Sequence, residues 1–231
     1  MVINDYAKEI EELARPVKKS PEEWENNILD AAQTLFASKG YEETSVSDLM
    51  NLAGGAKGMF YRFFQSKEEV MYALSKKLFF ENNPFDTIKG RNDLNALQKI
   101  RYLLVHNQSD TTRNDLNKQA IPVLKDPYIL AAAVKENRRI LTPLWLELLE
   151  EGKKDGSVKT EYTKELSELL PLINFWFIPS VFPASEEELR HKFQFVIELF
   201  AHMGLPVFED ETVSFAEQLI TDIAGTEGDR P

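Results

Sequence analysis

The chain has 231 residues, 43% of them hydrophobic, which is enough to bury a substantial core in one large or two modest domains. It has no cysteine, which excludes disulfides, a thiolate nucleophile and sulfur-ligated zinc and favours a cytoplasmic location. Its formal net charge of -11 speaks against a polyanionic partner unless the surface is locally basic, because phosphate contacts supply most non-specific DNA affinity.

The first 19 residues are expected to form an amino-terminal extension. Apolar residues recur there at helical spacing and the pattern stops at Pro16, which predicts a short lead-in helix. The acidic residues of this segment do not follow the order of a secretion signal. The longest apolar stretch, residues 169 to 182, contains two prolines and is shorter than the roughly 20 residues that a membrane span requires. No membrane partner is therefore expected.

Apolar residues at helical spacing recur along the whole chain and no segment alternates convincingly at period two, so the fold is predicted to be all-α. The first firm helix ends at Gly40, which with Tyr41 is typical of a left-handed cap and its apolar contact. Ser45 and Asp48 form a predicted capping box that begins a short helix, and this helix ends near Gly54.

A second short helix is predicted for residues 57 to 64. It is long enough for barely two turns, and Phe60, Phe63 and Phe64 fall together on one side. The residues left facing outward are Lys57, Met59, Tyr61 and Arg62. Because Gly55 and Ala56 precede this helix, it lacks a side-chain cap, which removes about 1 kcal/mol of stabilisation.

A connecting helix is predicted for residues 67–83, because Ser66 with Glu69 is a second capping box and Pro84 marks a boundary. Beyond Pro84 the pattern predicts helices at 92–108, 112–124, 127–151, 161–180, 186–203 and 211–224. We expect residues 84–224 to form one larger helical domain and residues 225–231 to be a disordered tail.

Residues 20–66 combine a longer helix, a short helix, a glycine turn and a second short helix, the helix-turn-helix arrangement whose second helix can enter a major groove. In order and spacing this region resembles the TetR family, the tetracycline-repressor-like regulators. The matching positions are Ile28-Leu29-Asp30-Ala31-Ala32, Leu35-Phe36, Lys39-Gly40-Tyr41, Thr44-Ser45-Val46, Leu49, Ala53-Gly54, Lys57-Gly58, Phe60-Tyr61, Phe63 and Ser66-Lys67-Glu68-Glu69. The match spans about 45 residues, about one fifth of the chain, and its turns, caps and aromatic positions agree.

The resemblance implies a transcription repressor that acts as a homodimer on a palindromic operator in double-stranded DNA. It also implies that residues 84–224 bind a small-molecule effector and form the dimer. The DNA-contacting residues that it assigns are Thr44 and Lys67 at phosphates, Tyr61 at the backbone, and Lys57, Gly58 and Met59 in the groove. Gly58 would let the backbone approach DNA closely.

Four features of the DNA-contacting region depart from the TetR pattern, and the first is that Gly55 and Ala56 stand where an apolar residue and a serine are usual. Arg62 replaces a common histidine and adds a charge that can reach phosphate or a guanine edge. Met59 replaces a small hydroxyl residue and offers an apolar contact to a thymine methyl. The first helix lacks an arginine that relatives often carry, and Lys18 and Lys19, just before it, could supply the missing contact.

Aromatic residues crowd the carboxy-terminal half, a pattern typical of a buried core and, alternatively, of an apolar ligand pocket with few polar groups. His106 and Asn174 are expected to be buried polar residues that either orient a ligand or are satisfied in the core. The predicted ligand-binding residues are His106, Trp145, Asn174, Phe175, Trp176 and Phe177. In TetR-like regulators the last two long helices pair in the dimer, which here gives Leu169, Ile173, Leu189, Phe193, Val196, Ile197 and Phe200 as interface residues.

Two other interpretations remain open. An all-helical enzyme would need a nucleophile with its base, a metal cluster or a phosphate loop, and the sequence has none at recognisable spacing. No catalytic residue, metal or cofactor is therefore assigned, although scattered carboxylates leave a cryptic activity open. The second interpretation is a helical small-molecule-binding protein that has lost DNA binding, which the acidic balance and the uncapped second helix favour.

Overall fold

The computed structural model describes residues 19–81, 83–106, 111–209, 213–214 and 221. Within these ranges every regular element is a helix and there is no strand, which confirms the all-α prediction. The predicted lead-in helix, Lys18, the helix at 211–224 and the tail at 225–231 lie wholly or largely outside the described residues. None of the helices described is both long and apolar enough to cross a membrane.

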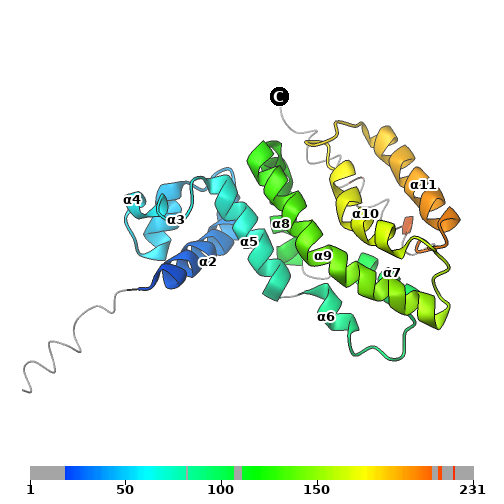
Figure 1. Cartoon of the computed structure of the whole chain (residues 1–231). Coiled ribbons are helices and arrows are strands. Elements are labelled where there is room, and N and C mark those ends of the chain that lie inside the picture. Colours follow the sequence, from blue (N-terminus) through cyan, green and yellow to red (C-terminus); the bar gives the residue numbers. More distant parts are fainter. Residues whose placement is uncertain (1–18, 82, 107–110, 210–212, 215–220, 222–231) are drawn as a thin grey trace, which may run out of the picture.

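The helices α2 to α5 lie at one end of the molecule, α10 and α11 lie at the other, and α8 and α9 lie between them (Figure 1). In chain order the elements are α2 (Pro21–Lys39), α3 (Val46–Ala53), α4 (Lys57–Phe60), α5 (Lys67–Glu81), α6 (Pro84–Ile88), α7 (Ala96–His106), α8 (Thr111–Ala120), the 3₁₀ helix η1 (Ile121–Lys125), α9 (Pro127–Asp155), α10 (Thr163–Trp176) and α11 (Glu186–His202).

Side-chain caps begin the first two helices. The predicted capping box of Ser45 and Asp48 is present at α3, where each residue accepts a hydrogen bond from the other's backbone N–H. A further capping box of Ser20 and Glu23, which sequence analysis missed, begins α2. These caps satisfy backbone N–H groups that the first turn of a helix leaves without partners.

The two glycines that end α2 and α3 differ in conformation. Gly54 has φ 79° and ψ 30°, in the left-handed region that favours glycine. Gly40 has φ 92° but ψ 152°, so the left-handed cap predicted there is wrong. Its N–H still donates to the Phe36 carbonyl, and the ring of Tyr41 packs edge-on against Phe36 with centroids 5.2 Å apart.

Two helix starts after α5 differ from the predicted ones because asparagines cap them. Pro84 begins α6, a helix that sequence analysis missed, and the Asn83 side chain accepts a hydrogen bond from the Phe85 N–H. The next helix, α7, begins at residue 96 and not at 92. Asn95 and Gln98 bond each other's backbone N–H groups at 2.9 Å, which places the cap at Asn95.

Two helix ends also differ from the predicted ones. The long helix α9 continues past Gly152 to Asp155 and ends at Gly156, which has φ 79°. Gly152 serves packing, because a Cβ there would lie 2.5 Å from Cγ2 of Val158. The helix α10 ends at Trp176 and not at residue 180, since Pro179 disfavours a helical residue before it.

The buried apolar residues form two main clusters. The first joins α2 to α5 around Phe36 and Phe60, both 0% exposed, and it includes Leu116, Val123 and Ile129 from α8, η1 and α9. The second joins α6, α7, α9, α10 and α11. Residues from both sides of the boundary predicted near residue 84 therefore pack in the first cluster. Because each buried aliphatic side chain stabilises by about 1.5–3 kcal/mol, α8 and η1 are firmly joined to the helix-turn-helix unit.

Candidate nucleic-acid interface and effector cavity

The second helix of the helix-turn-helix, α4, is shorter than predicted. It covers the four residues Lys57–Phe60, its N-cap Ala56 provides no side-chain hydrogen bond, and it is followed by a turn in which the Phe63 N–H donates to the Phe60 carbonyl. Phe60 and Phe64, 0% and 4% exposed, hold this segment to the core. The uncapped start was predicted, and it leaves the position of α4 dependent on these two rings.

The outward surface of this segment carries Lys57, Gly58, Tyr61 and Arg62, all exposed. Tyr61 is 59% exposed, and within the described part of the chain Lys57 and Arg62 form no ion pair. A Cβ at Gly58 would meet nothing within 4 Å, so the protein's own packing does not require a glycine there. Met59, by contrast, is half-buried and packs against the first cluster, which limits the outward role predicted for it.

The glycine turn before α4 is shaped by close packing. A Cβ at Gly55 would lie 2.7 Å from Cε of Met50 and 2.9 Å from Cζ3 of Trp24. Lys19 lies on the same side: its Nζ is 4.5 Å from the centroid of a Trp24 ring and 3.4 Å from the Ala53 carbonyl oxygen. Lys19 therefore stabilises the carboxyl end of α3, and Lys18 is outside the described residues.

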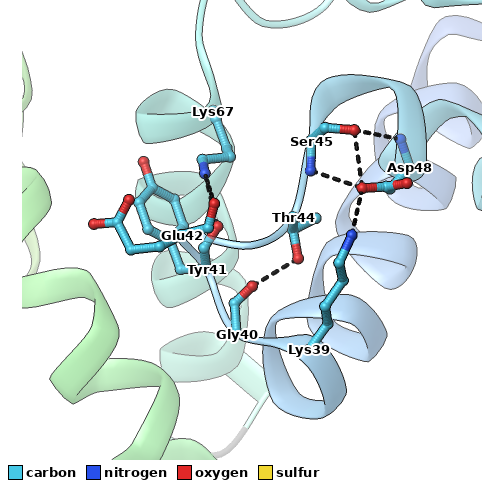
Figure 2. Close-up of polar contacts among 8 residues, drawn as sticks. All are labelled: Lys39, Gly40, Tyr41, Glu42, Thr44, Ser45, Asp48 and Lys67. Carbon is cyan, nitrogen blue, oxygen red and sulfur yellow. Dashed lines mark hydrogen bonds and ion pairs between the residues drawn. The ribbon is translucent and has the colours of Figure 1, made fainter.

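Thr44, which the resemblance assigns to a phosphate, is only 1% exposed. Its hydroxyl donates to the Gly40 carbonyl at 2.7 Å and so closes the turn between α2 and α3 (Figure 2). In this conformation the Thr44 hydroxyl is therefore not available for the phosphate contact that the resemblance assigns to it. The accessible hydroxyls at the start of α3 belong to Ser45, which is exposed, and Ser47, which is half-exposed. The capping box of Ser45 and Asp48 already indicates from the sequence that α3 begins here.

Asp48 holds the start of α3 together electrostatically. Its Oδ2 lies 2.8 Å from Nζ of Lys39 and accepts hydrogen bonds from the N–H and the hydroxyl of Ser45, each at 2.9 Å (Figure 2). The Lys39 ammonium, followed by the two Ser45 donors, lowers the pKa of Asp48 well below its usual range. The carboxylate thus stays ionised, and its Oδ2 is engaged by three donors.

Lys67 is a tether within the protein. Its Nζ donates to the carbonyl oxygens of Tyr41 at 2.7 Å and Glu42 at 3.2 Å, and it lies 4.2 Å from the centroid of the Tyr41 ring (Figure 2). Lys67 therefore fastens the start of α5 to the turn that precedes α3. At most one of its three ammonium hydrogens is left for the phosphate contact that the sequence predicts.

Tyr41 connects three elements. Its backbone N–H donates to Oε1 of Gln119, in α8, at 2.8 Å, and its hydroxyl donates to Glu68, in α5, at 3.0 Å. Burial, and secondarily the Glu68 carboxylate, raises the pKa of Tyr41. The turn before α3 is therefore held by side chains from both the connecting helix and the larger helical domain. Sequence reasoning missed Gln119, because nothing in a local pattern brings residues 41 and 119 together.

A cavity of about 180 Å³ lies where α5, η1, α9 and α10 meet. Its lining residues are mostly apolar, and they are Met71, Tyr72, Ser75, Ala120, Ile121, Val123, Leu124, Ile129, Ala133, Asn137 and Phe175. Among the predicted ligand-binding residues only Phe175 belongs to this set. The Oγ of Ser75 is buried and has no hydrogen-bond partner among the described residues.

The other predicted ligand-binding residues lie elsewhere. Trp145 is buried in the second cluster with its ring 5.1 Å from that of Phe85. Trp176 lines a shallow surface hollow with Phe195, Phe177 is half-buried, and the side chain of His106 is outside the described residues. Asn174 is exposed, so the expectation that it is buried is wrong. It stands near the end of α10, on the side that faces away from the cluster.

Some of the predicted dimer-interface residues are buried within the chain, and others are at least partly exposed. Leu189, Phe193, Val196 and Phe200 are at most 8% exposed and form part of the protomer's own core, so they are not free to meet a partner. The apolar face of α11 turns inward because the helix packs on its own domain. Leu169 is 36% exposed, and Ile173 and Ile197 are half-buried. The large apolar side chains that α10, α11 and their connection leave most exposed are Leu169, Leu172, Phe182 and Phe195.

The amino-terminal unit is similar to known regulators. Residues 28–74 match the family model described as "Bacterial regulatory proteins, tetR family". The HTH-type transcriptional repressor KstR2 of Rhodococcus jostii is 28% identical over 152 residues, which cover 61% of this chain and 70% of that protein. The uncharacterized HTH-type regulator YvdT of Bacillus subtilis is 39% identical over 64 residues, 28% of this chain and 32% of the relative.

Solved structures share the fold. Salmonella enterica GusR superposes with a TM-score of 0.54 at 14% identity, over 90% of this chain and 98% of that chain. Thermus thermophilus FadR, a TetR-family repressor in complex with lauroyl-CoA, superposes with a TM-score of 0.55 at 20% identity, over 75% and 93% of the two chains. At these identities the likeness concerns the arrangement of helices alone.

Proposed function

We propose that this chain is a transcriptional repressor of the TetR family whose operator binding is controlled by a small, largely apolar effector. One observation supports this most: Lys57, Tyr61 and Arg62 stand exposed around Gly58, a glycine that the protein's own packing does not need. Two cations and a phenol on one surface segment can bond phosphates and base edges. Gly58 leaves room for DNA to approach the backbone.

In this proposal the operator contacts come from α4 and from the start of α3. Lys57 and Arg62 supply the locally basic surface that the acidic chain needs, because they are not neutralised by carboxylates among the described residues. Ser47 takes over the phosphate contact that Thr44 cannot make, since its hydroxyl is half-exposed at the positive end of α3. Arg62 and Tyr61 fix the position of α4 by contacting phosphates on either side of the groove.

The active form in this proposal is a homodimer on a palindromic operator. Leu169, Leu172, Phe182 and Phe195, from α10, α11 and their connection, are 36–55% exposed, and apolar side chains of this size gather where a second copy packs. Two copies related by a twofold axis would place their α4 segments about 34–36 Å apart, in adjacent major grooves. This set replaces the buried residues of α11 as the proposed interface.

Effector control is proposed to act through the turn that precedes α3. Lys67 and Gln119 hold this turn from α5 and α8, so a shift of either helix changes how α3 and α4 are presented. An effector needs to bind the DNA-competent and DNA-incompetent forms unequally, and a difference of about 1–3 kcal/mol gives roughly 5- to 150-fold regulation.

The test is fluorescence anisotropy with a labelled duplex from the region upstream of the chain's own coding sequence. We expect Tyr61→Ala to weaken binding about thirtyfold, because one hydrogen bond of about 1 kcal/mol is lost in each of two protomers. Tyr128→Ala is the matched control, since Tyr128 is 84% exposed on α9 and should leave binding unchanged. Equal behaviour of the two variants would contradict the assigned interface.

A second candidate is a helical ligand-binding protein that has lost DNA binding. The exposed Glu42 and Glu43, beside the start of α3, favour it, because they would lie close to phosphates. The same titration separates the two candidates. A wild-type chain that binds no duplex at low salt would support this alternative.

A further inference from the structure

The cavity between α5, η1, α9 and α10 has a lining that selects for one kind of molecule. None of its lining residues carries a charged side chain, and its polar groups are those of Tyr72, Ser75 and Asn137. Burial, with Glu136 as a further cause, raises the pKa of Tyr72, so its hydroxyl is neutral at physiological pH. A charged group inside the cavity would lose part of its hydration without gaining an ion pair from the lining residues.

The volume of the cavity further restricts the kind of ligand that it can hold. The cavity measures about 180 Å³ and is partly open to solvent, and a closed apolar cavity of about 150 Å³ in a protein accommodates benzene. The present space therefore fits a single ring with one small substituent or an aliphatic chain of similar bulk. The nucleotide part of a thioester such as the lauroyl-CoA bound by Thermus thermophilus FadR would have to lie outside this space.

Ser75 gives the cavity a specific polar requirement. Its Oγ is buried without a hydrogen-bond partner among the described residues, and leaving such a group unpaired is costly. Asn137, which lines the cavity from α9, is only weakly engaged, since its Nδ2 lies 3.5 Å from the Pro171 carbonyl oxygen. A ligand with one hydroxyl or carbonyl group would satisfy Ser75 while its apolar part fills the remaining space.

We propose that this cavity is the effector site and that it takes an uncharged, mainly apolar molecule of about one ring in size, whose single polar group bonds Ser75. The inference rests on the proposed function for its regulatory meaning. The position of the cavity explains how a bound effector alters DNA binding. The helix η1, which forms one wall, begins two residues after Gln119, and the Gln119 side chain accepts a hydrogen bond from the Tyr41 N–H. The helix α5, which forms another wall, begins at Lys67, the second group that holds the same turn.

The binding test is isothermal titration calorimetry of the full chain with benzyl alcohol, toluene, benzoate and benzylamine. We expect benzyl alcohol and toluene to bind and the two charged probes not to bind. Ser75→Ala should weaken benzyl alcohol about fivefold relative to toluene, because only the alcohol loses a hydrogen bond of about 1 kcal/mol. This comparison stays informative if the absolute affinities are weak.

A cavity-filling variant locates the probe. Ala133→Leu places extra methyl groups in the cavity and should weaken benzyl alcohol about tenfold or more, whereas Ala131→Leu, on the exposed side of the same helix, should not. Circular dichroism establishes that both variants are folded. No binding to the wild type, equal binding of benzoate, or unchanged binding to Ala133→Leu would overturn the assignment.

The regulatory part is tested by repeating the DNA titration with saturating benzyl alcohol. A change in DNA affinity that Ala133→Leu abolishes supports the effector role, and binding without any change in DNA affinity contradicts it. If the chain binds no DNA at all, the proposed function fails, while the calorimetric result still decides whether the cavity is a ligand site.

Discussion

Replacing Lys67 by methionine separates a structural tether from a DNA contact. The side chain keeps its apolar stem in Lys67→Met but loses two charge-assisted hydrogen bonds, to the Tyr41 and Glu42 carbonyls, and a cation–π contact with the Tyr41 ring. Buried bonds to a charged group contribute about 1.5–3 kcal/mol each. Because Lys67 is half-exposed, solvent screening reduces the sum to about 2 kcal/mol.

For a chain of this size, a loss of about 2 kcal/mol lowers the melting temperature by about 4–8 °C, which thermal unfolding followed by circular dichroism would detect. Lys57→Met is the matched control: Lys57 is exposed and forms no ion pair among the described residues, so its melting temperature should stay within about 1 °C of wild type. An unchanged melting temperature for Lys67→Met, with reduced DNA affinity, would refute the tether and restore a purely phosphate-contacting role.

Three further results are expected. The pKa of Asp48 is lowered in the folded chain, so its stabilisation is complete above its unfolded pKa of about 4 and is lost gradually as the pH falls from that value through the lower folded pKa; the melting temperature of Asp48→Asn should be below that of wild type at pH 7, and the difference should begin to narrow below about pH 4. Gln119→Ala should reduce the effect of benzyl alcohol on DNA affinity by about threefold or more, measured by anisotropy, whereas an undiminished response would exclude this route. Phe195→Glu should convert the proposed dimer to a monomer in analytical ultracentrifugation, and a persistent dimer would place the interface elsewhere.

Local signals allowed the helix-turn-helix to be predicted from sequence. The Ser45 and Asp48 capping box, the Gly54 turn and the uncapped start of α4 depend on residues within a few positions of one another, and all three are present. The exposed position of Lys57, Tyr61 and Arg62 follows from the same short-range periodicity.

Tertiary contacts set the limits of that prediction. The family resemblance assigns Thr44 to a DNA phosphate, but the Thr44 hydroxyl donates to the Gly40 carbonyl, while the neighbouring Ser45 is exposed. The geometry of the turn decides which of these two adjacent residues is accessible. The hydrogen bond between Gln119 and Tyr41 joins residues 78 positions apart, so no local sequence pattern predicts it. In the same way, the apolar stripe of α11 is compatible with a dimer face or with a core, and Leu189 and Phe200 show that it forms core.

The account depends above all on Lys57 and Arg62 meeting DNA phosphates in both protomers. The most direct measurement is the salt dependence of operator binding by the wild type and by Lys57→Met. Four neutralised phosphates predict a slope of log K against log salt of about -3.6 or steeper, and loss of Lys57 from both protomers should make it shallower by about 1.8. A wild-type slope near zero, or a Lys57→Met slope equal to that of wild type, would contradict the account.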